Sequence, residues 1–178
     1  MKSSLFMLAL CAGTTAVMAA PRESFNIVAL NGGNLIGDAV LNGAGNSIVP
    51  VTVVGSDGGG AYSVLSVRAV GNVALWGANT YGSEAKVRLT APNATFIEFS
   101  PSALLSTPPG PVAFDQAFNF SVAAPAGAWS VQTYETFNDA SVDSTYDALT
   151  ITLNDAVLPP PTPPTNTDLG DLSLAASS

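Results

Sequence analysis

Hydrophobic and polar residues alternate strictly along several short segments of the chain. In the segment 148–153, Leu149, Ile151 and Leu153 alternate with alanine and threonine. Successive side chains of a strand leave opposite faces of a sheet, so this pattern predicts a half-buried β-strand. The longer segment 128–153 predicts two such strands, joined as a hairpin by a polar, acidic loop.

Further short strands are expected along the chain, separated by turns rich in glycine and asparagine. Phe118, Phe120 and Val122, for example, are expected to point inward because polar residues separate them. About nine or ten short strands, with no amphipathic helical segment, predict an all-β fold, a two-sheet antiparallel β-sandwich. Besides the two strands of 128–153, the expected strands are 25–30, 35–41, 48–54, 61–70, 72–76, 85–91, 95–99 and 117–122. The proline-rich segment 100–115 is expected to be a long connection between sheets.

The two ends of the chain are predicted to lie outside this domain. Residues 1–19 have a basic start, a short apolar run and small residues at the end, so we expect a cleaved signal peptide. Their apolar run is shorter than the ~20 residues that cross a membrane. The β-sandwich domain is expected over 20–157, followed by a proline-rich linker and flexible tail over 158–178. A docking peptide and an extra edge strand are the alternatives for that tail.

Charge and composition exclude several classes of function. The chain has 13 Asp+Glu, 5 Lys+Arg, no histidine and one cysteine. Its basic residues are not clustered, so nucleic acid and anionic membranes are not expected partners. The cysteine, Cys11, lies within the expected leader, which leaves the mature domain without the groups of a Ser-His-Asp or Cys-His nucleophile or a conventional zinc site. We therefore expect a secreted protein, extracellular or associated with a cell wall, that is not an enzyme.

One catalytic alternative needs no histidine. Glycosidases use two carboxyl groups that face one cleft, and Glu84, Glu98 and Glu135 are the candidates. Glu98 lies among apolar residues in F-I-E-F, where desolvation would raise its pKa. The competing expectation is that all three side chains lie on solvated faces of the sheets.

Aromatic residues provide a candidate binding surface. Trp76, Tyr81, Trp129 and Tyr134 are expected to form a platform on which sugar rings stack, with Tyr146 as a further member. The alternative for Trp129 is a place in the core, because it lies at the start of a predicted strand.

The acidic loop provides a candidate metal site. Asp139, Asp143 and Asp147 lie close together in the sequence with Asn138, and calcium takes oxygen ligands on flexible backbone. Their spacing matches no EF-hand loop, and Asp and Asn are also common in turns for local reasons. Calcium is the sole cofactor that the sequence suggests.

Two N-glycosylation sequons occur, at Asn93 and Asn119. Asn93 follows a proline at a predicted turn, and Asn119 lies on the predicted outer face of a strand. Both asparagines are therefore expected to be accessible.

The start of the chain carries a resemblance to a known group. The leader ending M-A-A-P, with F-N-I-V-A-L-N-G-G-N-L-I and V-L-N-G-A-G-N-S-I after it, resembles the opening of small secreted fungal cell-wall or surface proteins. Members of that group usually keep cysteines in the domain, and this chain does not. The resemblance implies a wall-associated or secreted β-sandwich and assigns no site residues.

Together these observations predict a secreted, non-catalytic β-sandwich that acts by binding or structural packing. The expected partner is a cell-wall polysaccharide or a surface protein, and a carbohydrate-binding module is the main alternative form of the hypothesis. Self-association is a further expectation, because uncharged strands such as 49–54 can pair at an exposed edge.

Overall fold

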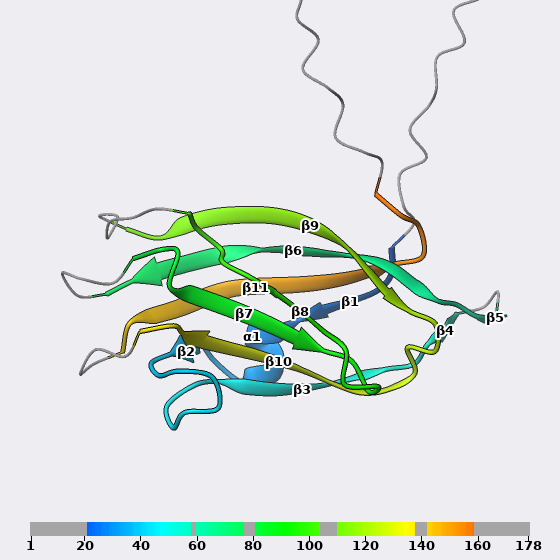
Figure 1. Ribbon diagram of the computed structural model, residues 1–178, viewed down its shortest axis with the longest axis horizontal. Helices are drawn as coiled ribbons and strands as arrows, with labels where there is room; N and C mark the ends of the chain where they lie inside the picture. The colour runs from blue at the N-terminus through cyan, green and yellow to red at the C-terminus, as the bar shows by residue number, and fades with distance from the viewer. Residues whose placement is uncertain (1–20, 58–59, 77–80, 104–109, 138–141, 159–178) are drawn as a thin grey trace, which may run out of the picture. The chain divides into compact units, whose positions relative to one another are not determined.

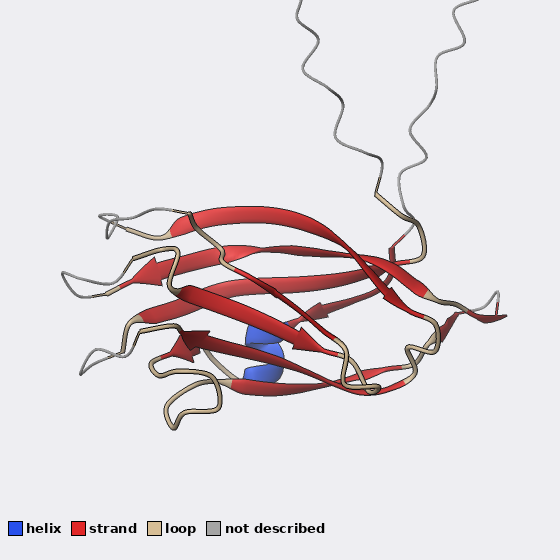
Figure 2. Cartoon of the chain, in the orientation of Figure 1, coloured by secondary structure: helices blue, strands red, loops and turns tan. Residues whose placement is uncertain are grey.

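The chain folds into two antiparallel β-sheets packed face to face, with one short helix between elements of the two sheets (Figures 1 and 2). The computed structural model describes residues 21–57, 60–76, 81–103, 110–137 and 142–158. The predicted fold class, a two-sheet antiparallel β-sandwich, is thereby confirmed. The expected signal peptide, 1–19, and all of the tail after residue 158 lie outside these ranges.

Eleven strands lie in the described part of the chain, where about nine or ten were expected. Sheet A has the order β1 (Pro21–Asn26), β11 (Ser144–Asn154), β6 (Val64–Leu75) and β9 (Val112–Val122), and β2 (Leu35–Gly37) also pairs with β11. Sheet B has the order β3 (Ile48–Val53), β10 (Gly127–Glu135), β7 (Ala85–Thr90) and β8 (Phe96–Phe99). The short strands β4 (Ser56–Asp57) and β5 (Gly60–Ala61) pair with each other.

The predicted alternation places side chains correctly. Leu149, Ile151 and Leu153 are buried in the core, and Phe118 packs against that core from β9. The connection from β8 to β9 passes from sheet B to sheet A, as the proline-rich segment predicted. β9 begins at Val112, however, inside the expected connection 100–115 and before the expected strand 117–122.

The segment 128–153 departs from the prediction in one respect, since its two strands do not form a hairpin. β10 belongs to sheet B and β11 belongs to sheet A, so the acidic loop joins the two sheets. Alternation specifies which face of a strand is buried, and it does not specify the partner strand. The segments 61–70 and 72–76, expected as two strands, lie mostly in the single long strand β6, which begins at Val64 and ends at Leu75.

The predicted strand 25–30 is wrong in its second half. The chain leaves β1 at Asn26 and forms the helix α1 (Ile27–Asn31). The Asn26 side chain accepts a hydrogen bond from the backbone N–H of Ala29 at 3.0 Å, which caps the helix start. Gly32 ends it in the left-handed region at a φ of 75°.

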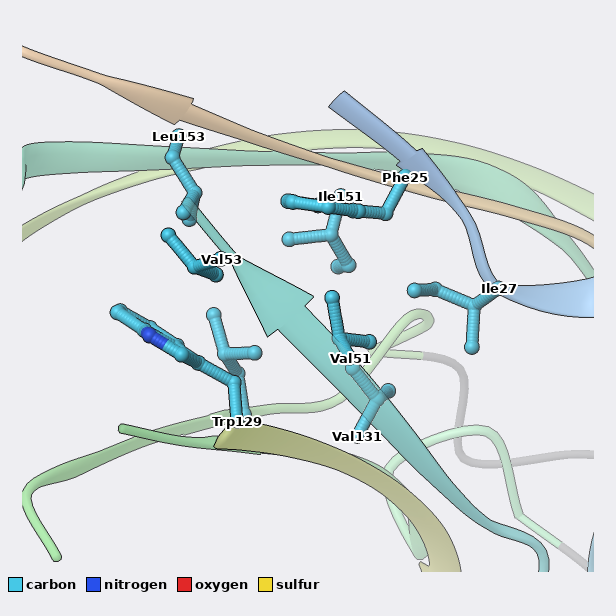
Figure 3. Close-up of a pocket in the computed structure, with 9 residues that line it drawn as sticks. Phe25, Ile27, Val51, Val53, Trp129, Val131, Ile151 and Leu153 are labelled. Carbon is cyan, nitrogen blue, oxygen red and sulfur yellow. The ribbon is translucent and has the colours of Figure 1, made fainter. Parts of the chain in front are cut away.

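Trp129 lies in the centre of the core rather than on the surface. Its ring faces Val53 of sheet B and Leu153 of sheet A (Figure 3), and it is 2% exposed. The indole Nε1 donates a hydrogen bond to the carbonyl oxygen of Pro125 at 2.6 Å, which satisfies its polar atom. The void between these side chains measures about 10 Å³, so the core is closely packed.

The uncharged strand that suggested self-association does lie at a sheet edge. β3 is the first strand of sheet B, but Pro50 in its centre has no N–H to offer a partner chain. Beyond the strand, the Glu23 carboxylate accepts hydrogen bonds from the N–H groups of Val54 and Gly55, at 3.0 and 2.8 Å. These features limit pairing along this edge, and self-association stays a prediction.

Gly71 of β6 is expected to tolerate no side chain. A Cβ at this position would lie 2.2 Å from the Ala148 carbonyl oxygen and 2.9 Å from the Phe114 ring. Because a backbone atom cannot rotate away, Gly71→Ala should lower the free energy of unfolding by about 1–3 kcal/mol, the usual cost of overpacking. Urea-induced unfolding measures this, with Gly33→Ala as the control, since a Cβ there meets nothing within 4 Å. Equal stabilities of the two variants would contradict the packing described for Gly71.

Candidate functional site

The outer face of sheet A, turned away from sheet B, carries a trough. Two hollows of about 460 and 430 Å³ follow one another along β6 and β11. The first is lined by residues that include Val70, Asn72 and Thr150, and the second by residues that include Trp76 and Thr145. At about 3.3 Å per residue, the stretch from Val70 to Trp76, along and just beyond the end of β6, is about 20 Å long.

Small side chains form much of the floor of the trough. Ala74 of β6, Ala113 of β9 and Ala148 of β11 contribute one methyl group each. These residues alternate with the buried side chains of their strands, so their side chains point outward. Because they are small, the outer surface of the sheet is hollowed at this place. The space above them is open to solvent.

Polar groups line the trough along its length. Asn72 and Thr150 lie in the first hollow, and Asn34 and Thr145 lie in the second. Amides and hydroxyls both donate and accept hydrogen bonds. Each hollow also contains one carboxylate; they are Asp115 in the first and Asp147 in the second.

Trp76 stands at one end of the trough with its indole fixed. The side chain is 53% exposed. Its Nε1 donates a hydrogen bond to Thr145 Oγ1 at 2.9 Å, and its backbone N–H donates to the Asp143 carbonyl oxygen at 2.8 Å. The trough therefore ends in an aromatic surface that is held in one orientation and is accessible to a ligand.

The predicted aromatic platform does not form as one surface. Trp129 is in the core, and Tyr146 is also buried between the sheets. Tyr134 is 5% exposed, because it lies beside Arg88 on the outer face of sheet B. Tyr81 is 40% exposed, so Trp76 and Tyr81 are the two predicted platform residues that solvent reaches.

Glu98 does not have the raised pKa that the sequence predicted. Desolvation does raise the pKa of its carboxyl, but hydrogen bonds from Tyr134 and Arg88 outweigh this and lower it. Arg88 donates to Glu98 Oε2 from Nε at 3.0 Å and from Nη2 at 2.7 Å. The Arg88 guanidinium also lies 4.2 Å from the centroid of the Phe96 ring. The carboxylate is therefore one part of a paired surface network.

The expectation that all three glutamates are solvated is wrong for Glu135. This side chain is fully buried and points into the sandwich from the end of β10, whereas Glu98 lies on the opposite, outer face of sheet B. These two carboxylates therefore cannot face one cleft. Glu84, just before β7, is partly exposed.

The predicted calcium ligands are not brought together in the described part of the chain. Asp143 is buried, Asp147 is exposed in the trough, and Asp139 lies outside the described residues. Within the described ranges no group of three or more Asp, Glu, Cys or His side chains has the geometry to hold a metal ion. Calcium binding by the predicted loop thus stays a prediction.

Both sequon asparagines are exposed, as expected. Asn93 Oδ1 accepts hydrogen bonds from the Thr95 N–H at 3.1 Å and the Thr95 hydroxyl at 2.7 Å. Asn119 Oδ1 accepts from the Leu158 N–H at 2.9 Å. Glycosylation at either position stays a prediction. In the described ranges, no helix is both long enough and apolar enough to span a membrane.

Comparison with known proteins gives distant structural similarity alone. No known protein family and no curated protein sequence matches the chain. Dimeric latent PorU from Porphyromonas gingivalis is similar to 80% of this chain, which covers 14% of PorU, with 10% identity and a TM-score of 0.40. The CBM22-1 xylan-binding domain of Paenibacillus barcinonensis Xyn10C is similar to 78% of this chain and is covered completely, with 11% identity and a TM-score of 0.39.

A third similar structure is that of infectious bursal disease virus, Gt strain. It matches 84% of this chain, which covers 38% of the viral chain, with 12% identity and a TM-score of 0.28. None of the three is a fungal cell-wall protein, so the resemblance drawn from the start of the sequence stays a prediction. At these TM-scores, none of the three indicates what this chain does.

Proposed function

We propose that this protein is a secreted, non-catalytic β-sandwich that binds a neutral polysaccharide along the trough of sheet A. The observation that supports this most directly is Trp76, an exposed and oriented indole at the end of a trough lined by polar groups. Aromatic rings offer an apolar face against which the C–H face of a sugar ring packs.

The remaining parts of the trough suit the rest of a sugar chain. Asn72 and Thr150 offer amide and hydroxyl groups to sugar hydroxyls, and so do Asn34 and Thr145 nearer the indole. The low floor at Ala74 lets a chain lie close to the sheet. A trough about 20 Å long, running along two strands, fits an extended polymer better than a compact small molecule.

Charge favours a neutral polymer over an anionic one. The formal net charge of the chain is −8. Asp115 and Asp147 line the two hollows, whose lining includes no lysine or arginine among the described residues. Arg68 at the margin forms an ion pair with Asp115, with Nε 2.8 Å from Oδ1. An acidic polysaccharide would be repelled by this surface.

Blocking the trough should weaken binding without changing the core. Ala113→Trp places a large side chain over the trough floor and is expected to weaken binding at least about tenfold, because the sugar chain can no longer lie against the sheet. The measurement is affinity electrophoresis and pull-down with xylan, cellulose, β-glucan and chitin.

Ala117→Trp is the matched control for this experiment. Ala117 is exposed on the same strand as Ala113 and on the same face, but it does not line either hollow. We expect its binding to equal that of the unaltered protein. If the two variants bind equally well, or if the unaltered protein is retained on none of the four polymers, the proposed function is wrong.

A further inference from the structure

A second site, independent of the trough, lies inside the sandwich at the end of β10. Glu135 is completely buried there, and neither of its carboxyl oxygens has a hydrogen-bond partner of standard geometry among the described residues. Such a group is rare, because a buried polar group without a partner loses the hydrogen bonds that water would give it. Nearly every other buried polar group in a folded protein finds a partner.

Other oxygen atoms lie near the Glu135 carboxyl group. Asp143, just before β11, is also buried, and its negative charge acts on Glu135. The Ser144 hydroxyl is near, and it donates to the Gly37 carbonyl oxygen at 3.4 Å. The same carbonyl oxygen accepts from the Asp143 N–H at 3.2 Å. Carboxylate, hydroxyl and backbone carbonyl oxygens therefore converge from three separate elements.

The absence of a side chain at Gly37 lets the backbone of β2 come close to these oxygen atoms. A Cβ on Gly37 would lie 3.4 Å from Glu135 Oε1 and 2.5 Å from Ser144 Oγ. Any other residue would therefore push β2 away from these two oxygens. The glycine, the buried carboxylates and the hydroxyl form a small cradle of oxygen atoms, which we call the Glu135 cradle.

Negative charges outnumber positive ones around Glu135. Burial is the main reason that the pKa of its carboxyl is raised to about 8; the negative charges of Asp143 and Glu84 act in the same direction, and the Ser144 hydroxyl and the positive charge of Lys86 act against it. Lys86 points to the other face of sheet B, where its Nζ donates to Ser100 Oγ at 2.7 Å, so it does not neutralise the cradle directly.

We propose that the Glu135 cradle binds one calcium ion, with Glu135 and Asp143 as its charged ligands. Calcium takes six to eight oxygen ligands from carboxylates, carbonyls, hydroxyls and water, and it tolerates irregular geometry. A divalent cation neutralises two carboxylates at once, whereas a proton shared between them neutralises one. The ion would join β2, β10 and β11, and thereby link sheet B to sheet A. This site differs from the predicted loop site, because it uses Glu135 and does not use Asp147.

Calcium removal and addition test the proposal on the full chain. Protein stripped with EGTA is titrated with calcium chloride up to about 10 mM, a range that includes the weak affinities of extracellular modules. Native mass spectrometry is expected to show one calcium per chain. Thermal unfolding is expected to shift upward by about 10 °C when calcium is about 100 times above its Kd. Magnesium in parallel should give a much smaller shift, because it demands a tighter octahedral site.

Two glutamate variants test whether calcium binds in the Glu135 cradle or is attracted by the negative charge of the protein in general. Glu135→Gln should abolish both the bound calcium and the thermal shift, and without calcium it should unfold no earlier than the unaltered protein, because it buries no charge. Glu84→Gln removes an equal charge from a partly exposed position and should keep one bound calcium. If Glu135→Gln does not fold, Asp143→Asn provides the same test.

The proposal is overturned if the unaltered protein binds no calcium in this range, or if Glu135→Gln still binds it. If the unaltered protein binds no calcium, we expect a shared proton to reduce the negative charge of the cradle instead. Neither measurement uses polysaccharide, so failure here leaves the trough proposal standing, and failure of the trough proposal leaves this one standing.

Discussion

Trp129→Ala is expected to lower the free energy of unfolding by about 3–5 kcal/mol, the largest stability effect among the predictions for this protein. The indole fills the space between the two sheets, facing Val53 and Leu153 (Figure 3). It also packs edge-on against Phe120, with ring centroids 6.2 Å apart. Truncation would leave a cavity in a core whose existing void is about 10 Å³, and the Pro125 carbonyl oxygen would lose its donor.

Urea-induced unfolding followed by far-UV circular dichroism measures this loss. Trp76→Ala is the matched control, since it removes the same group from a position that is 53% exposed. We expect the free energy of unfolding of that control to be within about 0.5 kcal/mol of the value for the unaltered protein, as for most surface substitutions. Similar losses of stability in both variants would contradict the placement of Trp129 in the core and Trp76 on the surface.

Trp76→Ala should instead have its effect on binding. If the trough holds a polysaccharide, loss of the indole should weaken its affinity about 30-fold, because a central aromatic contact commonly contributes about 2 kcal/mol. Thr145 should matter less, since its role is to hold the indole edge through a 2.9 Å hydrogen bond. Isothermal titration with a soluble oligosaccharide of the retained polymer measures the change.

Phe96→Ala controls for the loss of an exposed aromatic ring in general. Phe96 is 52% exposed and lies on β8 of sheet B, far from the trough in the sheet order. Its removal should leave the affinity unchanged. An unchanged affinity in Trp76→Ala, or an equal loss of affinity in Phe96→Ala, would show that the Trp76 indole does not take part in binding.

The sequence predicts the layers of this fold better than their connections. Period-two alternation predicts which side chains of β9 and β11 are buried, because the pleat allows no other arrangement. It carries no information on which strand lies beside which, so β10 and β11 were expected to pair and do not. The helix at Ile27 was missed because its sequence is uniformly apolar, which suits a strand or a buried helix equally.

The candidate site was predictable only in part. Trp76 was identified as a binding residue because exposed aromatic groups are chemically conspicuous. The sequence did not identify Ala74, Ala113 and Ala148. Alanine carries no functional group, and these three form a surface only because three strands bring them together. Glu135 was identified as an acid but expected in solvent, because glutamate is rarely fully buried. In the structure it ends a run of five buried residues in β10.

The pairing of the first strand with the last has a consequence for how the chain reaches its native state. Among the described strands β1 pairs with β11 alone, with Phe25 opposite Ile151, and β11 is also the partner of β2 and β6. Sheet A therefore cannot be completed until almost the whole domain has been synthesised. Contacts between residues so distant in sequence make folding slow. β1 and β2 therefore lack their sheet partner until synthesis of the domain is nearly complete.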